Sequence, residues 1–242
     1  TVADVSSNTP GSSGGVLLLA SGHTAARPVL DAVQARVLGA LIEKETTTPE
    51  LYPLSLNSLR SACNQSSNRH PVMELSEHDI TEAIDDLKAL GLARVALRPE
   101  WRAPKYRHVA ADTWEWTAQQ SAVMCVLLLR GQQTVGELKG RTERLAAFSD
   151  LAECEAVLDQ LGSAGFTQRL PRAPGQKEAR WSHLLSGPVD VNTHLETSDV
   201  GNPVYALPRQ ERLAAAEQRV EELEARVAAL EAQLSALLAE LA

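Results

Sequence analysis

The stretch SEHDITEAIDDLKALGLARV, residues 76–95, decides the fold. Ser76 is typical of a helix cap, because its hydroxyl can accept a hydrogen bond from a free N–H of the first turn. Apolar side chains then recur at helical spacing between Ile80 and Leu90. Gly91 predicts the end of the helix, since glycine tolerates the left-handed backbone that follows many helices. The stretch therefore predicts a capped helix that leads directly into a strand.

A hairpin and two further helices flank this helix. Residues 92–97 alternate like a strand, residues 99–104 form a proline-containing turn, and residues 105–109 are typical of a returning strand. Upstream, the apolar spacing predicts helices over residues 30–45 and 55–62. Three helices and a β-hairpin are the winged-helix order, a variant of the helix-turn-helix.

The same order of elements recurs downstream. Helices are expected near residues 118–129, 135–141 and 150–164, and strands near residues 166–170 and 180–183. The two units align at their ends, because IDDL and GL within residues 84–92 correspond to LDQL and GF within residues 158–166. A repeated unit of this kind favours two tandem winged-helix domains.

The end of the chain follows a heptad pattern, which predicts a parallel, dimeric coiled coil. The expected dimerisation residues are Leu213, Val220, Leu223, Val227, Leu230, Leu234, Leu237 and Leu241. Flanking residues such as Arg212 and Glu217 have opposite charges, as pairing between two parallel helices requires. A single amphipathic helix docked on its own domain is the alternative.

These patterns give an expected organisation. It comprises a disordered N-terminal arm (1–28), winged-helix domain 1 (29–110), winged-helix domain 2 (111–187), a linker (188–208) and a coiled coil (209–242). The expected fold class is mainly α with small β-hairpins (α+β), as two tandem winged-helix domains followed by a C-terminal coiled-coil helix. The arm has neither the basic segment nor the long apolar run of a secretory signal.

Charge is distributed unevenly along the chain. The 23 Lys+Arg and 31 Asp+Glu give a net charge of -8, which excludes a polycation that coats nucleic acid indiscriminately. Residues 188–242 hold 4 basic and 10 acidic residues and so carry -6 of that charge. Both third helices are acidic, whereas basic residues surround both hairpins and the second helices. A nucleic acid would therefore be contacted by the hairpins and second helices, since acidic helices repel phosphates.

The polar loop over residues 64–69 is a further candidate, because Asn, Gln and Arg are the side chains that read base edges. The expected nucleic-acid-binding residues are Arg60, Asn64, Gln65, Asn68, Arg69, Arg94, Arg98, Arg102, Lys105, Arg107, Lys139, Arg141, Arg172 and Lys177. Alternatively, the basic residues on the hairpins are simply solvated, Asn64 caps a helix end, and Asn68 and Arg69 hold the loop.

Nothing in the sequence predicts an enzyme, a cofactor or a metal site. The chain has no GxxxxGK[ST] loop, no GxGxxG after a strand and no HExxH. Residues 43–45 (Glu-Lys-Glu) are interpreted as a solvated helix end. Cys63, Cys125 and Cys154 lie in apolar helical patterns and are interpreted as small core residues, which fits a reducing cytoplasm. No apolar run is long enough for a membrane helix.

Several blocks of sequence resemble the bacterial YceH family. They are VLGALIEKE (37–45), TTP (47–49), YPLSLN (52–57), ACNQ (62–65), SNR (67–69), PVM (71–73), LLLRG (127–131), GEL (136–138), RTERL (141–145) and RWSHL (180–184). The resemblance spans about residues 30–187 and implies tandem winged-helix domains, in many members followed by a coiled coil. It implies no catalytic residues.

Two functions are compatible with these patterns. The first is a cytoplasmic, dimeric DNA-binding protein, a transcriptional regulator that contacts double-stranded DNA through basic wings and second-helix residues. The alternative is a protein–protein interaction adaptor built on tandem winged helices, without nucleic acid, in which the acidic third helices suit a basic partner.

Overall fold

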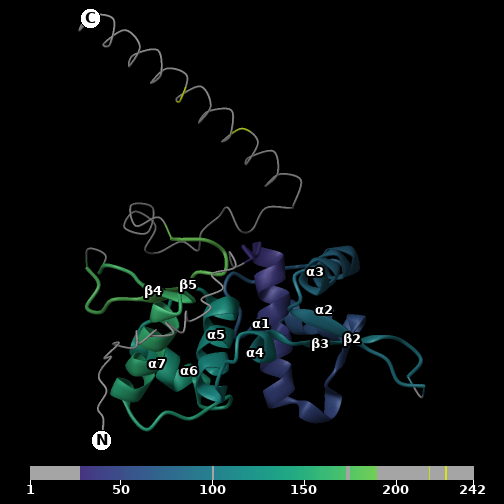
Figure 1. The fold of residues 1–242 in the computed structure, drawn as a ribbon, viewed down its shortest axis with the longest axis horizontal. Coiled ribbons are helices and arrows are strands. Elements are labelled where there is room, and N and C mark those ends of the chain that lie inside the picture. Colours follow the sequence, from purple (N-terminus) through teal and green to yellow (C-terminus); the bar gives the residue numbers. More distant parts are fainter. Residues whose placement is uncertain (1–27, 100, 173–174, 190–217, 219–226, 228–242) are drawn as a thin grey trace, which may run out of the picture.

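The computed structural model describes residues 28–99, 101–172, 175–189, 218 and 227. The expected N-terminal arm, linker and coiled coil therefore lie almost entirely outside the described residues. Of the expected dimerisation residues only Val227 is described; it is helical and 53% exposed. Among the described residues the chain forms a mixed α/β structure of seven α-helices and two small antiparallel sheets (Figure 1). None of these helices is both long and apolar enough to cross a membrane.

The first half of the body contains three helices and a three-stranded sheet. Its elements are α1 (Ala32–Thr47), the short 3-10 helix η1 (Pro49–Leu51), β1 (Leu54–Ser55), α2 (Leu56–Cys63), α3 (Glu77–Ala89), β2 (Ala93–Ala96) and β3 (Lys105–His108). The strand order is β1-β3-β2, with Leu54 opposite Tyr106 and Arg94 opposite Arg107. Strand β1 was not expected, because two residues are too few to show alternation.

The second half repeats this order after a short connecting helix. Its elements are α4 (Ala110–Thr113), α5 (Ala118–Arg130), α6 (Val135–Thr142), α7 (Leu151–Ser163), β4 (Thr167–Arg169) and β5 (Trp181–His183). An isolated bridge joins Gln133 to Trp181, so Gln133 occupies the place that β1 has in the first half. Each half is therefore ordered helix, short extended segment, helix, helix and hairpin.

The helices begin where side chains satisfy the free N–H groups of their first turns. Capping boxes start four of them, at Asp31, Ser76, Thr117 and Thr134. Helix α1 ends at Thr47, two residues beyond the expected Glu45, and the Thr47 hydroxyl donates to the carbonyl of Glu43 at 2.9 Å. Gly91 follows α3 with a φ of 72°, as its position predicted.

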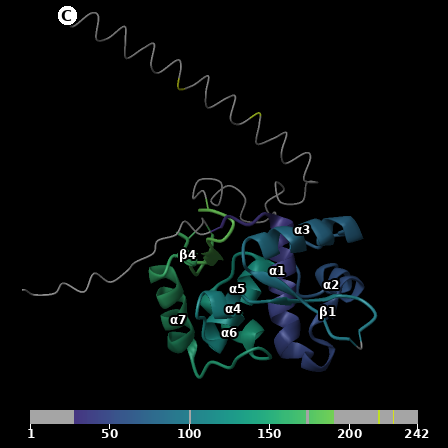
Figure 2. The ribbon, with the colours of Figure 1, turned by 45° about the vertical axis from the view of Figure 1, so that its right-hand side comes forward.

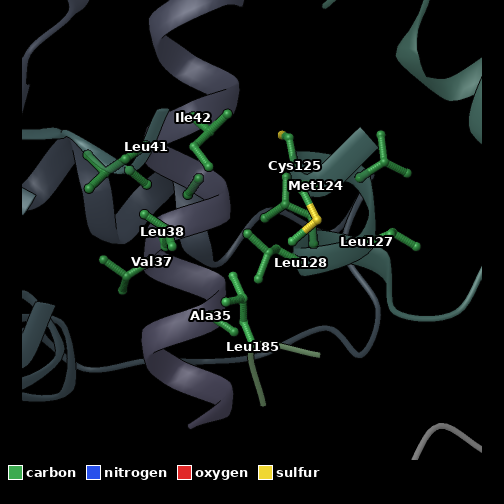
Figure 3. Packing of buried hydrophobic residues seen from close by; sticks show 14 of the residues in the cluster. Ala35, Val37, Leu38, Leu41, Ile42, Met124, Cys125, Leu127, Leu128 and Leu185 are labelled. Carbon is green, nitrogen blue, oxygen red and sulfur yellow. The ribbon is translucent and has the colours of Figure 1, made fainter. Parts of the chain in front are cut away.

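Helices α1 and α5 pack side by side and join the two halves (Figures 1 and 2). Gly39 permits this contact, because a Cβ there would lie 2.9 Å from Leu129 Cγ. Figure 3 shows Ala35 and Ile42 on the side of α1 that faces Leu128 of α5. Buried apolar residues of both halves consequently form one continuous cluster. All three cysteines are buried and free, which confirms their interpretation as small core residues.

Candidate nucleic-acid interface

Arg69 is the last residue of the polar loop that follows α2, and it is buried. Its side chain is 0% exposed, and its guanidinium donates to both carboxylate oxygens of Glu43, at 3.1 and 2.7 Å. Its Nε and one terminal nitrogen also donate to the carbonyl oxygen of Ala62, at 3.0 and 2.8 Å. These bonds tie the loop to α1 and to the end of α2. In this structure Arg69 offers no donor to an external ligand.

The neighbouring polar residues of this loop are also bonded within the protein. The side chain of Asn64, the C-cap of α2, accepts from the N–H of Leu75 and donates to its carbonyl oxygen. Gln65 Oε1 accepts from Arg69 at 3.0 Å. Asn68 has a φ of 59° and accepts from Arg130 at the end of α5. This geometry matches the alternative in which these residues cap a helix and hold the loop.

At the end of α1, Glu45 is exposed as the sequence indicated, but Glu43 is not. The Glu43 side chain is only 13% exposed. Burial raises the pKa of its carboxyl, but the hydrogen bonds and positive charge of Arg69, helped by Lys44, outweigh burial and hold this pKa below 4.5. The interpretation of Glu43 as solvated is therefore wrong, because its partner Arg69 is distant in sequence and close in the fold.

Glu45 connects α1 to the first hairpin. Its Oε2 lies 2.8 Å from Nε2 of His108, which is 3% exposed at the end of β3. This hydrogen bond lowers the pKa of Glu45, burial partly opposes it, and the charge of Arg107 adds a smaller lowering. The hydroxyl of Tyr52 accepts from the backbone N–H of His108 at 2.8 Å. The base of the hairpin is thus fixed to the body by two polar contacts.

The outer face of the β2–β3 hairpin carries cations. Arg94 and Arg107 are directly opposite each other on neighbouring strands, and Lys105 is on the same face two residue pairs further along. Like charges in this position destabilise a sheet unless an anion lies beside them. Arg94 and Arg102 are exposed, and neither forms an ion pair with any residue that the structure describes. The hairpin is thus a cationic surface with few counter-charges.

The tip of this hairpin combines cations with an aromatic ring and an apolar side chain. Arg98 Cζ lies 5.0 Å and Lys105 Nζ 4.7 Å from the ring centroid of Trp101. The N–H of Trp101 donates to the carbonyl of Arg98 at 3.0 Å, which closes a turn containing Pro99. Leu97, next to this turn, is 77% exposed.

The other expected contact residues are dispersed over α2 and the second half. Arg60 of α2 is partly exposed and donates to Asn57 at 3.1 Å. On α6, Arg141 pairs with Glu137 at 3.4 Å, whereas Lys139 is partly exposed without an ion pair among the described residues.

Arg172 and Lys177 are exposed on the segment between β4 and β5. Figures 1 and 2 show the hairpins of the two halves on opposite sides of the body. The structure therefore brings Arg94, Lys105 and Arg107 together but does not place the second hairpin beside them.

The helix α3 carries the opposite charge to the hairpin. Glu77 and Asp85 are exposed, and Asp86 accepts from Gln34 at 2.9 Å. Lys88 is the helix's one Lys or Arg, and it pairs with Asp85 at 2.9 Å. A polyanion would meet repulsion here and attraction at the β2–β3 hairpin.

Comparison with known proteins identifies the family. A family model described as a protein of unknown function, DUF480, matches residues 30–176. A UPF0502 protein of Aeromonas hydrophila is 46% identical over 197 residues, which cover 79% of this chain and 90% of that protein. A UPF0502 protein of Solibacter usitatus is 45% identical over 191 residues, which cover 79% and 91%. The chain therefore belongs to the DUF480 family of UPF0502 proteins, the family of YceH.

Proposed function

We propose that this chain is a double-stranded DNA-binding protein, a dimeric transcriptional regulator, that holds the phosphate backbone on the outer face of its β2–β3 hairpin. One observation carries the proposal: Arg94, Lys105 and Arg107 share one face, and Arg94 and Arg107 are directly opposite each other. Such a face is stabilised when bound phosphates offset the repulsion between neighbouring guanidinium groups.

The element order supports a DNA-binding fold. In each half a helix, a short extended segment, two helices and a hairpin follow one another, with the extended segment beside the last strand of the hairpin. That order is the winged-helix arrangement, a relative of the helix-turn-helix. We propose that both halves are winged-helix units and that β2–β3 and β4–β5 are their wings.

The position of the charges distinguishes this mode from the usual helix-turn-helix mode. In the usual mode the last helix of the motif enters the major groove. Here that helix is α3, which exposes Glu77 and Asp85. Backbone contact through the hairpin fits the charges of both elements. Dimerisation through the heptads of residues 209–242 would present two hairpins and raise the affinity through multivalency.

The experiment is a fluorescence anisotropy titration of a labelled duplex, repeated between about 50 and 200 mM salt. We expect log Kobs to fall linearly with log salt, and we expect Arg94→Glu to weaken binding and lower the slope by ~1. Arg144→Glu is the matched control, because Arg144 is exposed on the turn after α6 and the net charge changes equally. We expect that variant to bind like the wild type.

Two results would contradict the proposal. One is an absence of duplex binding at the lowest salt concentration, and this result would favour the protein adaptor. The other is an equal loss of affinity in Arg94→Glu and Arg144→Glu, which would indicate a response to overall charge rather than to the hairpin.

A further inference from the structure

We infer that Arg130 and Arg141 form a binding site for a phosphate group at the junction between the two halves of the body. Arg130 is the last residue of α5, and Arg141 is near the end of α6. Figure 1 shows α1 and α5 between α6 and strand β2, so this site is apart from the cationic face of the β2–β3 hairpin. The inference therefore goes beyond the proposed function and does not rest on it.

Arg130 lies where the loop after α2 meets the end of α5. Its guanidinium donates to Asn68 Oδ1, and the N–H of His70 donates to the carbonyl oxygen of Leu129 at 2.9 Å. These two contacts hold a loop of the first half against the last turn of a helix of the second half. Arg69, which follows Asn68 in the chain, consequently brings a further buried positive charge close to Arg130.

Arg141 and Arg180 are held near the same end of α5 by one carboxylate. Arg180 Nη1 donates to the carbonyl oxygen of Gln132, just after α5, at 3.1 Å and to Glu137 Oε2 at 3.0 Å. Arg141 Nη2 lies 3.4 Å from Oε1 of the same Glu137. Glu137 Oε2 also accepts from the N–H of Thr134 at 2.9 Å. A single carboxylate therefore serves two guanidinium groups and a helix cap.

Positive charge exceeds negative charge in this group of side chains. Four guanidinium groups share two carboxylates: Arg69, Arg130, Arg141 and Arg180 share Glu43 and Glu137. Arg130 itself forms no ion pair with any residue that the structure describes. A phosphate monoester carries about -1.5 to -2 charges at pH 7, which matches the excess of positive charge.

A structural role alone does not account for this arrangement. An arginine in the last turn of a helix complements the helix dipole, which explains Arg130 taken by itself. Partial burial lowers the pKa of Arg130, and the positive charges of Arg141 and Arg69 lower it further, against the opposing effect of two nearby carboxylates. The charged form of Arg130 is therefore disfavoured by its surroundings, and an anion bound between Arg130 and Arg141 would relieve that repulsion.

The donors that remain available suit a phosphate group. A guanidinium has five N–H donors in a planar fork that matches the spacing of phosphate oxygens. Arg130 contacts one side-chain acceptor among the described residues, and Arg141 is exposed with one ion-pair partner there. Arg69 contributes only its charge, because its guanidinium is bonded within the protein. The ligand is therefore a phosphate group, carried by a small molecule or by a nucleic-acid backbone.

The test is a calorimetric titration of the full chain with inorganic phosphate, in chloride buffer of matched ionic strength. We expect saturable binding by the wild type and about tenfold weaker binding by Arg130→Gln and by Arg141→Gln, since each variant loses a charge-assisted hydrogen bond. Arg141 is exposed, so Arg141→Gln keeps the test decisive if Arg130→Gln fails to fold. Arg169→Gln is the matched control, because it removes the same charge from the exposed pair with Glu155 on β4 and should bind phosphate like the wild type.

A duplex titration of the same variants identifies the source of the phosphate. If the site holds a nucleic-acid backbone, Arg130→Gln should weaken duplex binding and lower the salt slope by ~1. If the site holds a small phosphorylated ligand, Arg130→Gln should bind duplex like the wild type while it loses affinity for inorganic phosphate. Either result supports the site.

Two results would overturn the site. One is an absence of phosphate binding by the wild type together with no effect of Arg130→Gln on duplex binding. The other is an equal loss of phosphate affinity in Arg130→Gln and Arg169→Gln, which would indicate a response to overall charge. An absence of duplex binding overturns the proposed function alone, because the phosphate titration contains no DNA.

Discussion

Replacing Arg69 by methionine tests whether the loop after α2 is structural. Arg69 is 0% exposed, and it pairs with the Glu43 carboxylate and the carbonyl oxygen of Ala62. Methionine keeps much of the apolar stem but leaves the Glu43 carboxylate without its main partner. Removing one partner of a buried ion pair costs about 3–5 kcal/mol, because the remaining charge is poorly solvated.

We expect the lower end of this range, because Glu43 retains 13% exposure and a contact to Lys44 at 3.2 Å. A loss of about 3 kcal/mol lowers Tm by about 6–12 °C in a domain of this size. The assay is thermal unfolding followed by circular dichroism. Arg60→Met on α2 is the control, and we expect it to change stability by less than about 0.5 kcal/mol, because Arg60 is partly exposed.

A double-mutant cycle makes the test specific. Adding Glu43→Gln to Arg69→Met removes the stranded charge, so the double variant should lose less stability than the two single losses added together. An Arg69→Met variant that unfolds at the wild-type temperature, yet binds duplex more weakly, would refute the structural role. That result would return Arg69 to the set of DNA-contacting residues.

Three further predictions follow from the packing and the pKa values. Because the folded pKa of Glu43 lies below its ordinary 4.5, the stability that its carboxylate contributes is present above pH 4.5 and is lost as the pH falls through the folded value. Urea unfolding at a series of pH values should show a smaller loss of stability in acid for Arg69→Met than for the wild type. Gly39→Ala should lower the free energy of unfolding by ~1–3 kcal/mol, because the new Cβ meets Leu129. Gly140→Ala is the control: its Cβ has no atom within 4 Å, so it should stabilise α6 by ~0.5–1 kcal/mol. Equal effects of the two substitutions would contradict the α1–α5 packing. Burial raises the pKa of the Cys63 thiol to about 12, so a thiol reagent should modify it only after unfolding, and rapid native labelling would contradict its burial.

Local signals predicted most of the elements. Ser76 caps α3, Ser55 caps α2 and Gly91 ends α3 with the expected left-handed backbone, because each signal acts within one turn of its helix. Elements with weak local signals were missed. Strand β1 has two residues, and α4 has four, so neither shows a period in sequence.

The candidate site was predictable only where side chains remain at the surface. The exposure of Arg94 and Arg102 follows from their place on a hairpin. The burial of Arg69 depends on Glu43, which is 26 residues away in the sequence, and no local sequence pattern predicts that pair. The hydrogen bond between Glu45 and His108 has the same cause, since its partners are 63 residues apart. Contacts between residues that are distant in sequence therefore decide which cations hold the fold and which remain accessible to a ligand.

Protection of lysines from acetylation tests the central claim most directly. The chain has five lysines, Lys44, Lys88, Lys105, Lys139 and Lys177, which sample α1, α3, the first hairpin, α6 and the second hairpin. Mass spectrometry can follow the acetylation rate of each with and without saturating duplex DNA. We predict that duplex slows the acetylation of Lys105 strongly and leaves that of Lys88 unchanged. Protection of Lys88 on the acidic α3, with Lys105 as reactive as in the free protein, would contradict binding through the hairpin.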